Sequence, residues 1–223
     1  MWLSTVVVVG YANKLGESVC KRFLDAGCTV HGVDSASGVG SPLRGEMFTA
    51  HDVSRSPLPD IPDVDVLINL IDRQNSGADI DINLKGVINS TEKYGVQPNI
   101  RSILNLSNVA AHNGAEFPEY CASKGGVVAY TINVAKRVAK YGATCNSISI
   151  GGLMSNMNDP VINDPESWEK IMSMTPLRKW ISIEELVEWI YFFTMMNRSC
   201  TGQDLIVDNG EFFNHTFVWN ESK

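Results

Sequence analysis

Residues 5–16 read TVVVVGYANKLG, and this stretch decides the fold. The β-branched run at residues 5–9 has the near-continuous apolar character of a strand buried on both faces of a parallel sheet. Gly10 ends the run, and residues 15–26 then carry apolar side chains at helical spacing. A buried strand that turns at a glycine into a helix predicts the first unit of an α/β fold.

The rest of the chain continues this alternation of strands and helices. Further strands are predicted at residues 29–33, 47–50, 64–70, 103–106, 144–150 and 204–207, and helices at 83–94, 120–141, 165–173 and 182–196. Ser182 is expected to cap the last of these helices, because two glutamates follow it in the first turn. The pattern predicts a single domain over residues 1–223, a Rossmann-like, doubly wound parallel sheet with helices on both faces.

Composition narrows the class of partner. The 223 residues have a net charge of −7 and a pI near 5.1, and no basic cluster is longer than Lys21-Arg22. These features argue against nucleic acid and anionic membranes and favour a small-molecule partner. The five scattered cysteines lack the spacing of metal ligands, so we expect reduced thiols in a cytoplasmic protein without a metal site. No apolar stretch is long enough to span a membrane.

The turn after the first strand is a candidate phosphate site. A glycine turn that opens onto a helix brings backbone N–H groups and the positive end of the helix dipole to a pyrophosphate. The residues expected to contact a dinucleotide here are Gly10, Asn13, Lys14, Leu15 and Gly16. Two glycines at this spacing also occur in ordinary turns, but the flanking strand and helix favour nucleotide binding.

Acidic residues follow the second and third predicted strands. Asp34 stands where a carboxylate accepts hydrogen bonds from the adenosine ribose and repels a 2′-phosphate, which favours NAD over NADP. The alternative is a plain turn residue, since Asp is common in turns. Asp52 and Val53 could hold the adenine in the same way, or Asp52 could merely start a turn.

Tyr120 and Lys124 form a candidate acid–base pair. At i and i+4 they lie on one face of a helix, where the lysine ammonium favours the phenolate and makes tyrosine a usable proton donor and acceptor. A surface Tyr/Lys pair is the alternative for so short a motif. Cys121, beside the tyrosine, is interpreted as a small packing residue rather than a reactive thiol.

Taken together, these motifs resemble the short-chain dehydrogenase/reductase family over essentially the whole chain. Tyr120 and Lys124 match its Y-x-x-x-K motif, Gly10 and Gly16 match the outer glycines of its turn, and Asn83 matches its catalytic asparagine. The resemblance implies that Asn83 positions a water that feeds the proton relay. The resemblance implies further cofactor contacts from the end of the fourth strand and from the loop after the sixth, at Asn69, Leu70, Gly151, Leu153 and Ser155.

Three departures from the family pattern stand out. Lys14 replaces the middle glycine of the turn, where it could hinder the pyrophosphate or pair with it. Residues 69–72, Asn-Leu-Ile-Asp, replace Asn-Asn-Ala-Gly, and Ile150 replaces a proline.

Two residues compete for the position of the family's serine that polarises the substrate carbonyl. Aligning the local sequence with the family's motif places Asn108 at the serine position, whereas the usual spacing from Tyr120 selects Ser107. We favour Asn108, whose amide N–H could donate to a carbonyl oxygen.

The sequence therefore predicts an NAD(H)-dependent oxidoreductase that interconverts a secondary alcohol and a ketone. Residues 1–110 would form mainly the cofactor half, and residues 111–223 would hold the catalytic pair and a mobile substrate segment at 153–180. Helices 83–94 and 120–141 and the apolar tail Phe212, Phe213, Phe217 and Trp219 would form the contacts of a homotetramer or homodimer. The alternatives are a catalytically degenerate NAD-binding scaffold protein and an enoyl reductase.

Overall fold

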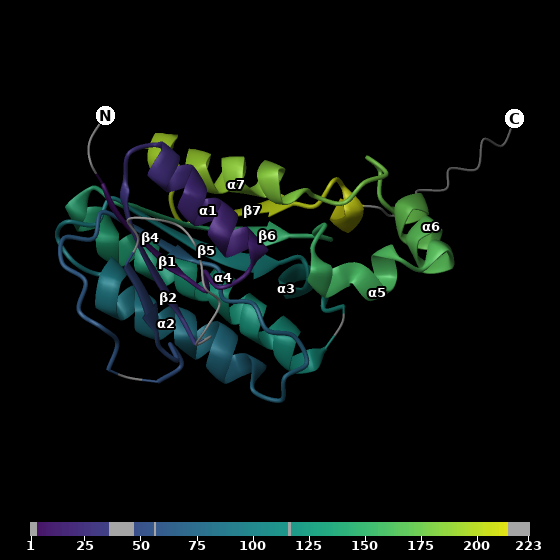
Figure 1. The fold of residues 1–223 in the computed structure, drawn as a ribbon, viewed down its shortest axis with the longest axis horizontal. Helices are drawn as coiled ribbons and strands as arrows, with labels where there is room; N and C mark the ends of the chain where they lie inside the picture. The colour runs from purple at the N-terminus through teal and green to yellow at the C-terminus, as the bar shows by residue number, and fades with distance from the viewer. Residues whose placement is uncertain (1–3, 36–46, 56, 116, 214–223) are drawn as a thin grey trace, which may run out of the picture.

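The computed structural model describes residues 4–35, 47–55, 57–115 and 117–213, and its centre is a seven-stranded sheet (Figure 1). The strand order is β3-β2-β1-β4-β5-β6-β7, and each neighbouring pair is parallel. The strands are β1 (Thr5–Val9), β2 (Thr29–Asp34), β3 (Met47–Ala50), β4 (Val66–Asn69), β5 (Ser102–Asn108), β6 (Thr144–Ile150) and β7 (Asp204–Val207). The predicted doubly wound α/β fold is confirmed.

Helices cover both faces of the sheet. In Figure 1, α1 (Lys14–Asp25) and α7 (Ile183–Tyr191) lie on one face, and α2 (Gly86–Ser90) and α4 (Pro118–Val138) lie on the other. The shorter helical segments are η1 (Ile80–Lys85), η2 (Thr91–Gly95), α3 (Ala110–Asn113), η3 (Ala139–Tyr141), η4 (Asn156–Asn158), α5 (Asp159–Ile162), α6 (Pro165–Met174), η5 (Phe192–Met196) and η6 (Glu211–Phe213). In the part of the chain that the structure describes, no helix combines the length and the hydropathy needed to cross a membrane.

The valine run of β1 explains why the sheet is buried on both sides. Val6 and Val8 join the core beneath α1 and α7, whereas Val7 and Val9 join the core beneath α2 and α4. All four valines have no exposed surface. Because alternate residues of a strand face opposite sides, an unbroken apolar run is the pattern that a two-faced parallel strand requires.

Element boundaries differ from the sequence prediction at several points. The fourth strand is shorter than 64–70, the fifth is longer than 103–106, and α3 and α5 were not predicted. The helix predicted at 83–94 begins at Ile80 and contains π-helical turns, η1 and η2, around α2. Ser90 Oγ bonds back to the carbonyls of Gly86 and Val87, which is a local competition that apolar periodicity does not reveal.

The predicted cap of α7 is present. Ser182 Oγ accepts from the Glu185 N–H and the Glu185 carboxylate accepts from the Ser182 N–H, so the two residues form a capping box. The helix predicted at 165–173 is also found, as α6. Of the predicted apolar tail, Phe217 and Trp219 lie outside the described residues, while Phe212 packs edge-on against His112.

A buried polar network joins the two middle strands to the helices below them. Asn69 Nδ2 donates to Asn105 Oδ1 at 2.8 Å and to Thr91 Oγ1 at 3.1 Å, and Asn69 Oδ1 accepts from Ser90 Oγ at 2.7 Å. Asn105 Nδ2 donates in turn to Thr131 Oγ1 of α4 at 2.9 Å. All five side chains have no exposed surface, so these hydrogen bonds replace contacts with water.

Replacing Asn69 by alanine is expected to destabilise the fold by about 2–4 kcal/mol, because three buried hydrogen bonds are lost and their partners stay buried. Urea unfolding followed by circular dichroism measures this loss. Asn99→Ala is the matched control, since Asn99 donates to Asp63 at the exposed surface, and its effect should stay within about 0.5 kcal/mol. A loss below about 1 kcal/mol for Asn69→Ala would contradict the structural role of the network.

Candidate active site

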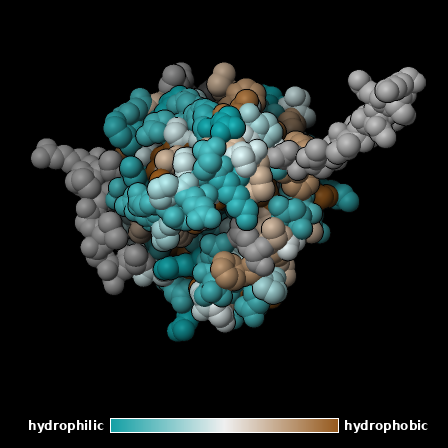
Figure 2. Space-filling view, turned by 90° about the vertical axis from the view of Figure 1, so that its right-hand side faces the viewer, coloured by the Kyte–Doolittle hydropathy of each residue, from teal (hydrophilic) through white to brown (hydrophobic). Residues whose placement is uncertain are grey.

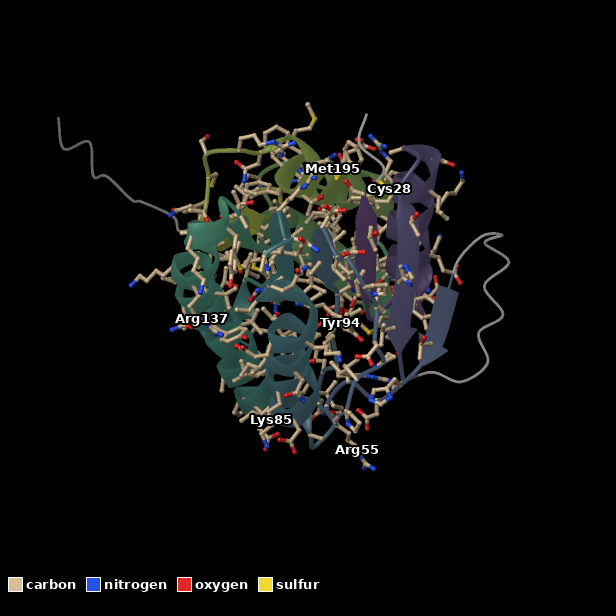
Figure 3. All side chains as sticks on the ribbon, turned by 90° about the vertical axis from the view of Figure 1, so that its left-hand side faces the viewer. Cys28, Arg55, Lys85, Tyr94, Arg137 and Met195 are labelled. Carbon is tan, nitrogen blue, oxygen red and sulfur yellow. The ribbon has the colours of Figure 1, made fainter. Side chains whose placement is uncertain are left out.

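A cleft of 640 Å³ lies at the carboxyl ends of the strands. This is where a doubly wound sheet binds its ligand, next to the point where strand order reverses between β1 and β4. In Figure 3 the strand arrows run toward the end of the molecule where Arg55 and Lys85 lie. The lining includes Gly10, Asn13, Lys14, Leu15, Asp34, Asp52, Val53, Leu70, Asp72, Arg73, Leu153 and Ser155.

The glycine turn forms one wall of the cleft, and close packing explains its two glycines. Gly10 has φ +82°, and a Cβ at this position would lie 2.9 Å from the Leu70 carbonyl carbon. A Cβ on Gly16 would lie 2.4 Å from the Tyr11 backbone. Asn13 caps α1 by accepting from the Gly16 N–H, and Lys14 is exposed at the cleft. The first turn of α1 therefore presents its N-terminal backbone groups to the cleft.

Asp34 and Asp52 border the cleft beyond this turn. Asp34 Oδ2 accepts the Ala12 N–H at 2.9 Å, which fixes the carboxylate beside the glycine turn. Asp52 Oδ1 accepts from Ser54 Oγ at 2.6 Å, and this hydrogen bond, with the nearby Arg55 guanidinium, lowers the pKa of Asp52. Val53 is buried and also lines the cleft.

Tyr120 and Lys124 lie behind Asp72 at the inner end of the cleft. The Tyr120 hydroxyl donates to Asp72 Oδ1 at 3.0 Å, and Lys124 Nζ lies 2.9 Å from the same oxygen. Lys124 Nζ also donates to Ile71 O at 3.0 Å and lies 3.5 Å from Leu106 O. Tyr120 is 2% exposed and Lys124 is 0% exposed, whereas the Asp72 side chain is 20% exposed and lines the cleft. The predicted pair is therefore together, with a carboxylate between it and the cleft.

Asn83 lies next to this cluster and hydrogen-bonds to the backbone of Arg73, the residue after Asp72. Its Oδ1 accepts the Arg73 N–H at 2.8 Å, and its Nδ2 donates to Arg73 O at 2.7 Å and to Ser123 Oγ at 3.1 Å. Asn83 thereby fixes the segment that carries Asp72. Its predicted role in holding a catalytic water stays a prediction.

The two candidates for the carbonyl-orienting residue are engaged in other contacts. Ser107 is 1% exposed and donates to the Lys124 carbonyl at 3.1 Å. Asn108 Oδ1 accepts the Ala110 N–H at 2.8 Å at the start of α3. Asn69, also expected at the cofactor, directs its side chain into the buried network described above. For these three residues the predicted site roles stay predictions.

The loop after β6 borders the cleft through Leu153 and Ser155, whereas Gly151 of the same loop is not part of the cleft lining. A Cβ on Gly151 would lie 2.7 Å from Asp208 Cβ and 3.2 Å from Glu211 Oε2. Burial raises the pKa of the Glu211 carboxyl. Residues 153–180, for which substrate contact stays a prediction, continue through α5 and α6, on a face that is mostly hydrophilic with small apolar patches (Figure 2).

Asp72 is the site residue that the sequence analysis did not assign. The signal was present, because residues 69–72 depart from the family pattern and place an acid where glycine is usual. Its contact with Tyr120 joins residues 48 positions apart and could not be derived from local spacing. Arg73, Ser76 and Ile82 line the cleft as well and were likewise not predicted.

Solved structures of known proteins share this fold. A short-chain type dehydrogenase/reductase from Mycobacterium ulcerans superposes with a TM-score of 0.83 at 17% identity, covering 95% of this chain and 90% of that one. A putative 2-deoxy-D-gluconate 3-dehydrogenase from Agrobacterium tumefaciens with bound NADP has a TM-score of 0.79 at 18% identity, covering 94% and 96%. At such identities the likeness concerns the fold alone.

Sequence relatives carry the comparison further. The chain is 29% identical over 138 residues to the 3-oxoacyl-(acyl-carrier-protein) reductase FabG of Staphylococcus aureus, a match that covers 60% of this chain and only 55% of that protein. It is 25% identical to the FabG of Thermotoga maritima over 92% of this chain and 96% of that protein. The family model described as enoyl-(acyl carrier protein) reductase matches residues 65–211. The chain belongs to the short-chain dehydrogenase/reductase family of oxidoreductases.

Proposed function

We propose that this protein is an NAD(H)-dependent oxidoreductase that interconverts a secondary alcohol and a ketone. The observation that carries the proposal is that the Tyr120 hydroxyl and the buried Lys124 ammonium meet at one carboxylate oxygen of Asp72, which lines a cleft that Asp34 also borders. A proton-handling group and a ribose-binding carboxylate at the two ends of one cleft suit hydride transfer to or from a carbonyl.

The residues of the cleft fit a dinucleotide. Its volume lies within the range of about 300–1,000 Å³ that is typical of ligand sites. The first turn of α1 offers backbone N–H groups to a pyrophosphate, and the exposed Lys14 adds a positive charge beside it. When bound, the nicotinamide nucleotide supplies or accepts the hydride.

The chain's own side chains handle the proton and the substrate oxygen. In ketone reduction, Tyr120 gives its hydroxyl proton to the substrate oxygen, and in alcohol oxidation it takes that proton back. The Lys124 ammonium stabilises negative charge on the oxygens around it. Asn108 is our first candidate to orient the carbonyl, with Ser107 as the alternative.

Asp34 favours NAD(H) over NADP(H). A 2′-phosphate beside this carboxylate would meet charge repulsion, whereas two ribose hydroxyls could donate to it. The Agrobacterium structure contains bound NADP, so the shared fold alone does not determine the nucleotide, and the proposal of NAD(H) rests on Asp34.

The names of the sequence relatives suggest the first substrate to test. They are 3-oxoacyl-thioester reductases, so a small 3-oxoacyl thioester such as acetoacetyl-N-acetylcysteamine is a suitable probe. Exposed apolar side chains at Met154 and Met157, at the start of the substrate segment, could contact such an acyl chain. A cytoplasmic location and assembly as a homotetramer or homodimer remain proposals from the sequence.

A second candidate function is an NAD-binding regulatory or scaffold protein. It is favoured by the same Asp72 contact, because a carboxylate that holds both Tyr120 and Lys124 separates them from the cleft. The engagement of Asn108 with the Ala110 N–H points the same way. Nucleotide binding without turnover would identify this function.

We expect the purified protein to bind NADH at least ~10-fold more tightly than NADPH, measured by the fluorescence of the bound nicotinamide. Asp34→Asn should narrow this preference, because the amide oxygen can still accept the Ala12 N–H while the charge that repels a 2′-phosphate is gone. Tighter binding of NADPH to the unmodified protein would contradict the role of Asp34.

Tyr120→Phe should lower turnover of acetoacetyl-N-acetylcysteamine by ~100-fold or more, because the proton donor is removed. Its affinity for NADH should change by less than ~3-fold, since the hydroxyl contributes to the proton step and not to the adenosine end of the cleft. Tyr130→Phe is the control, because Tyr130 donates to Glu92 away from the cleft and also lies in α4. Equal turnover in Tyr120→Phe and the unmodified protein would remove Tyr120 from the mechanism.

A further inference from the structure

One carboxylate contacts both members of the acid–base pair. Asp72 Oδ1 accepts the Tyr120 hydroxyl at 3.0 Å and lies 2.9 Å from Lys124 Nζ. The residue also lines the cleft, and its side chain keeps 20% of its surface exposed. Asp72 therefore links the buried Tyr120 hydroxyl to solvent within a single side chain.

The other polar groups around Tyr120 have their hydrogens engaged. Lys124 Nζ has three N–H donors, and three acceptors surround it, Asp72 Oδ1, Ile71 O and Leu106 O. Asn83 Nδ2 donates both its hydrogens, to Arg73 O and to Ser123 Oγ. In this arrangement Asp72 is a group in direct contact with Tyr120 that can itself gain a proton and release it into the cleft.

We propose that Asp72 is the positioning residue and proton acceptor for Tyr120, so that the proton of the oxidised alcohol leaves through Asp72 into the cleft. This inference rests on the proposed function of the Tyr120 site. It assigns to Asp72 the proton relay that was expected from the sequence to run through a water at Asn83.

Oxidation of an alcohol by this route releases one proton through Asp72. The carbinol C–H bond breaks and its hydride passes to the oxidised nicotinamide nucleotide, which is reduced. The alcohol O–H proton passes to the Tyr120 oxygen as the Tyr120 proton passes to Asp72, and the substrate becomes a ketone. Asp72 then releases one proton to water, which restores the starting state. Ketone reduction runs through the same groups in reverse.

Charged groups from several elements surround Asp72. Lys124 faces it from α4, Arg73 follows it in the chain, and Asp79 faces Lys124 from the start of η1. Burial disfavours a charged Asp79, but hydrogen bonds from Ser76 and Asn75 and the charge of Lys124 outweigh burial and lower the pKa of Asp79. Asp72 and Asp79 therefore both interact with the charge of buried Lys124. Of these two acids, Asp72 accepts the Tyr120 hydroxyl, whereas the described hydrogen bonds of Asp79 come from Asn75 and Ser76.

A second tyrosine of α4 also donates to a carboxylate, and comparing the two contacts shows what distinguishes the Tyr120 cluster. Tyr130 donates to Glu92 at 2.8 Å, and Arg137 holds that carboxylate at 2.6 and 2.7 Å. Burial, followed by the bond to Glu92, raises the pKa of Tyr130. None of these three residues lines the cleft at the strand ends. In the Tyr120 cluster, by contrast, the carboxylate that accepts the tyrosine hydroxyl lines the cleft.

The test compares Asp72→Asn, Asp72→Glu and the unmodified protein in oxidation of 3-hydroxybutyryl-N-acetylcysteamine by NAD⁺, over a range of pH. The amide of Asp72→Asn can still accept the Tyr120 hydroxyl, but it cannot take its proton. We expect kcat to fall ~10-fold or more, KM and NADH affinity to change less than ~3-fold, and the acidic limb of the kcat profile to disappear. Asp72→Glu should restore that limb.

Asp81→Asn is the matched control, because it removes one exposed negative charge from η1, where Asp81 pairs with Lys85. It should leave kcat and its pH profile unchanged. An unchanged profile in Asp72→Asn, with turnover still dependent on Tyr120, would overturn the relay and leave the proposed function standing. Higher kcat and tighter NADH binding in Asp72→Asn would also overturn it, since Asp72 would then be an obstruction. Absence of turnover in the unmodified protein, whether or not NADH binds, would overturn both proposals.

Discussion

A buried lysine ammonium must be surrounded by acceptors, and this requirement ties the fold to the site. Lys124 has no exposed surface, and its Nζ is held by the carbonyls of Ile71 and Leu106 and by the Asp72 carboxylate. These contacts join α4 to the ends of β4 and β5. The ammonium pairs with the Asp72 carboxylate, which also accepts the Tyr120 hydroxyl at the inner end of the cleft. The same charge therefore orders the strand ends and determines which chemistry is available there.

The architecture could be predicted from short patterns because burial acts on local spacing. The valine run of β1 predicted a strand covered on both faces, and Ser182 with Glu185 predicted the start of α7. Tyr120 and Lys124 could be paired because one helical turn separates them. Gly10 and Gly16 were predicted for phosphate contact, and the structure adds that their missing side chains also permit close packing against Leu70 and Tyr11.

The remaining features depend on contacts between distant residues. Asn69 was expected at the cofactor from the family resemblance, but its side chain joins a network with Asn105 and Thr91 that only the assembled sheet creates. Asp72 was noted as a departure and given no role, since its partners lie about fifty residues away in sequence. Apolar periodicity does not encode the π-helical turns that flank α2.

A crystal structure of the protein with bound NADH would test the central claim most directly, namely that the cleft at the strand ends is a dinucleotide site served by Tyr120. The account predicts the adenosine ribose hydroxyls within hydrogen-bond distance of the Asp34 carboxylate and the nicotinamide ring at the end of the cleft near Tyr120. A nucleotide bound away from Asp34, or a nicotinamide ring far from Tyr120, would contradict it.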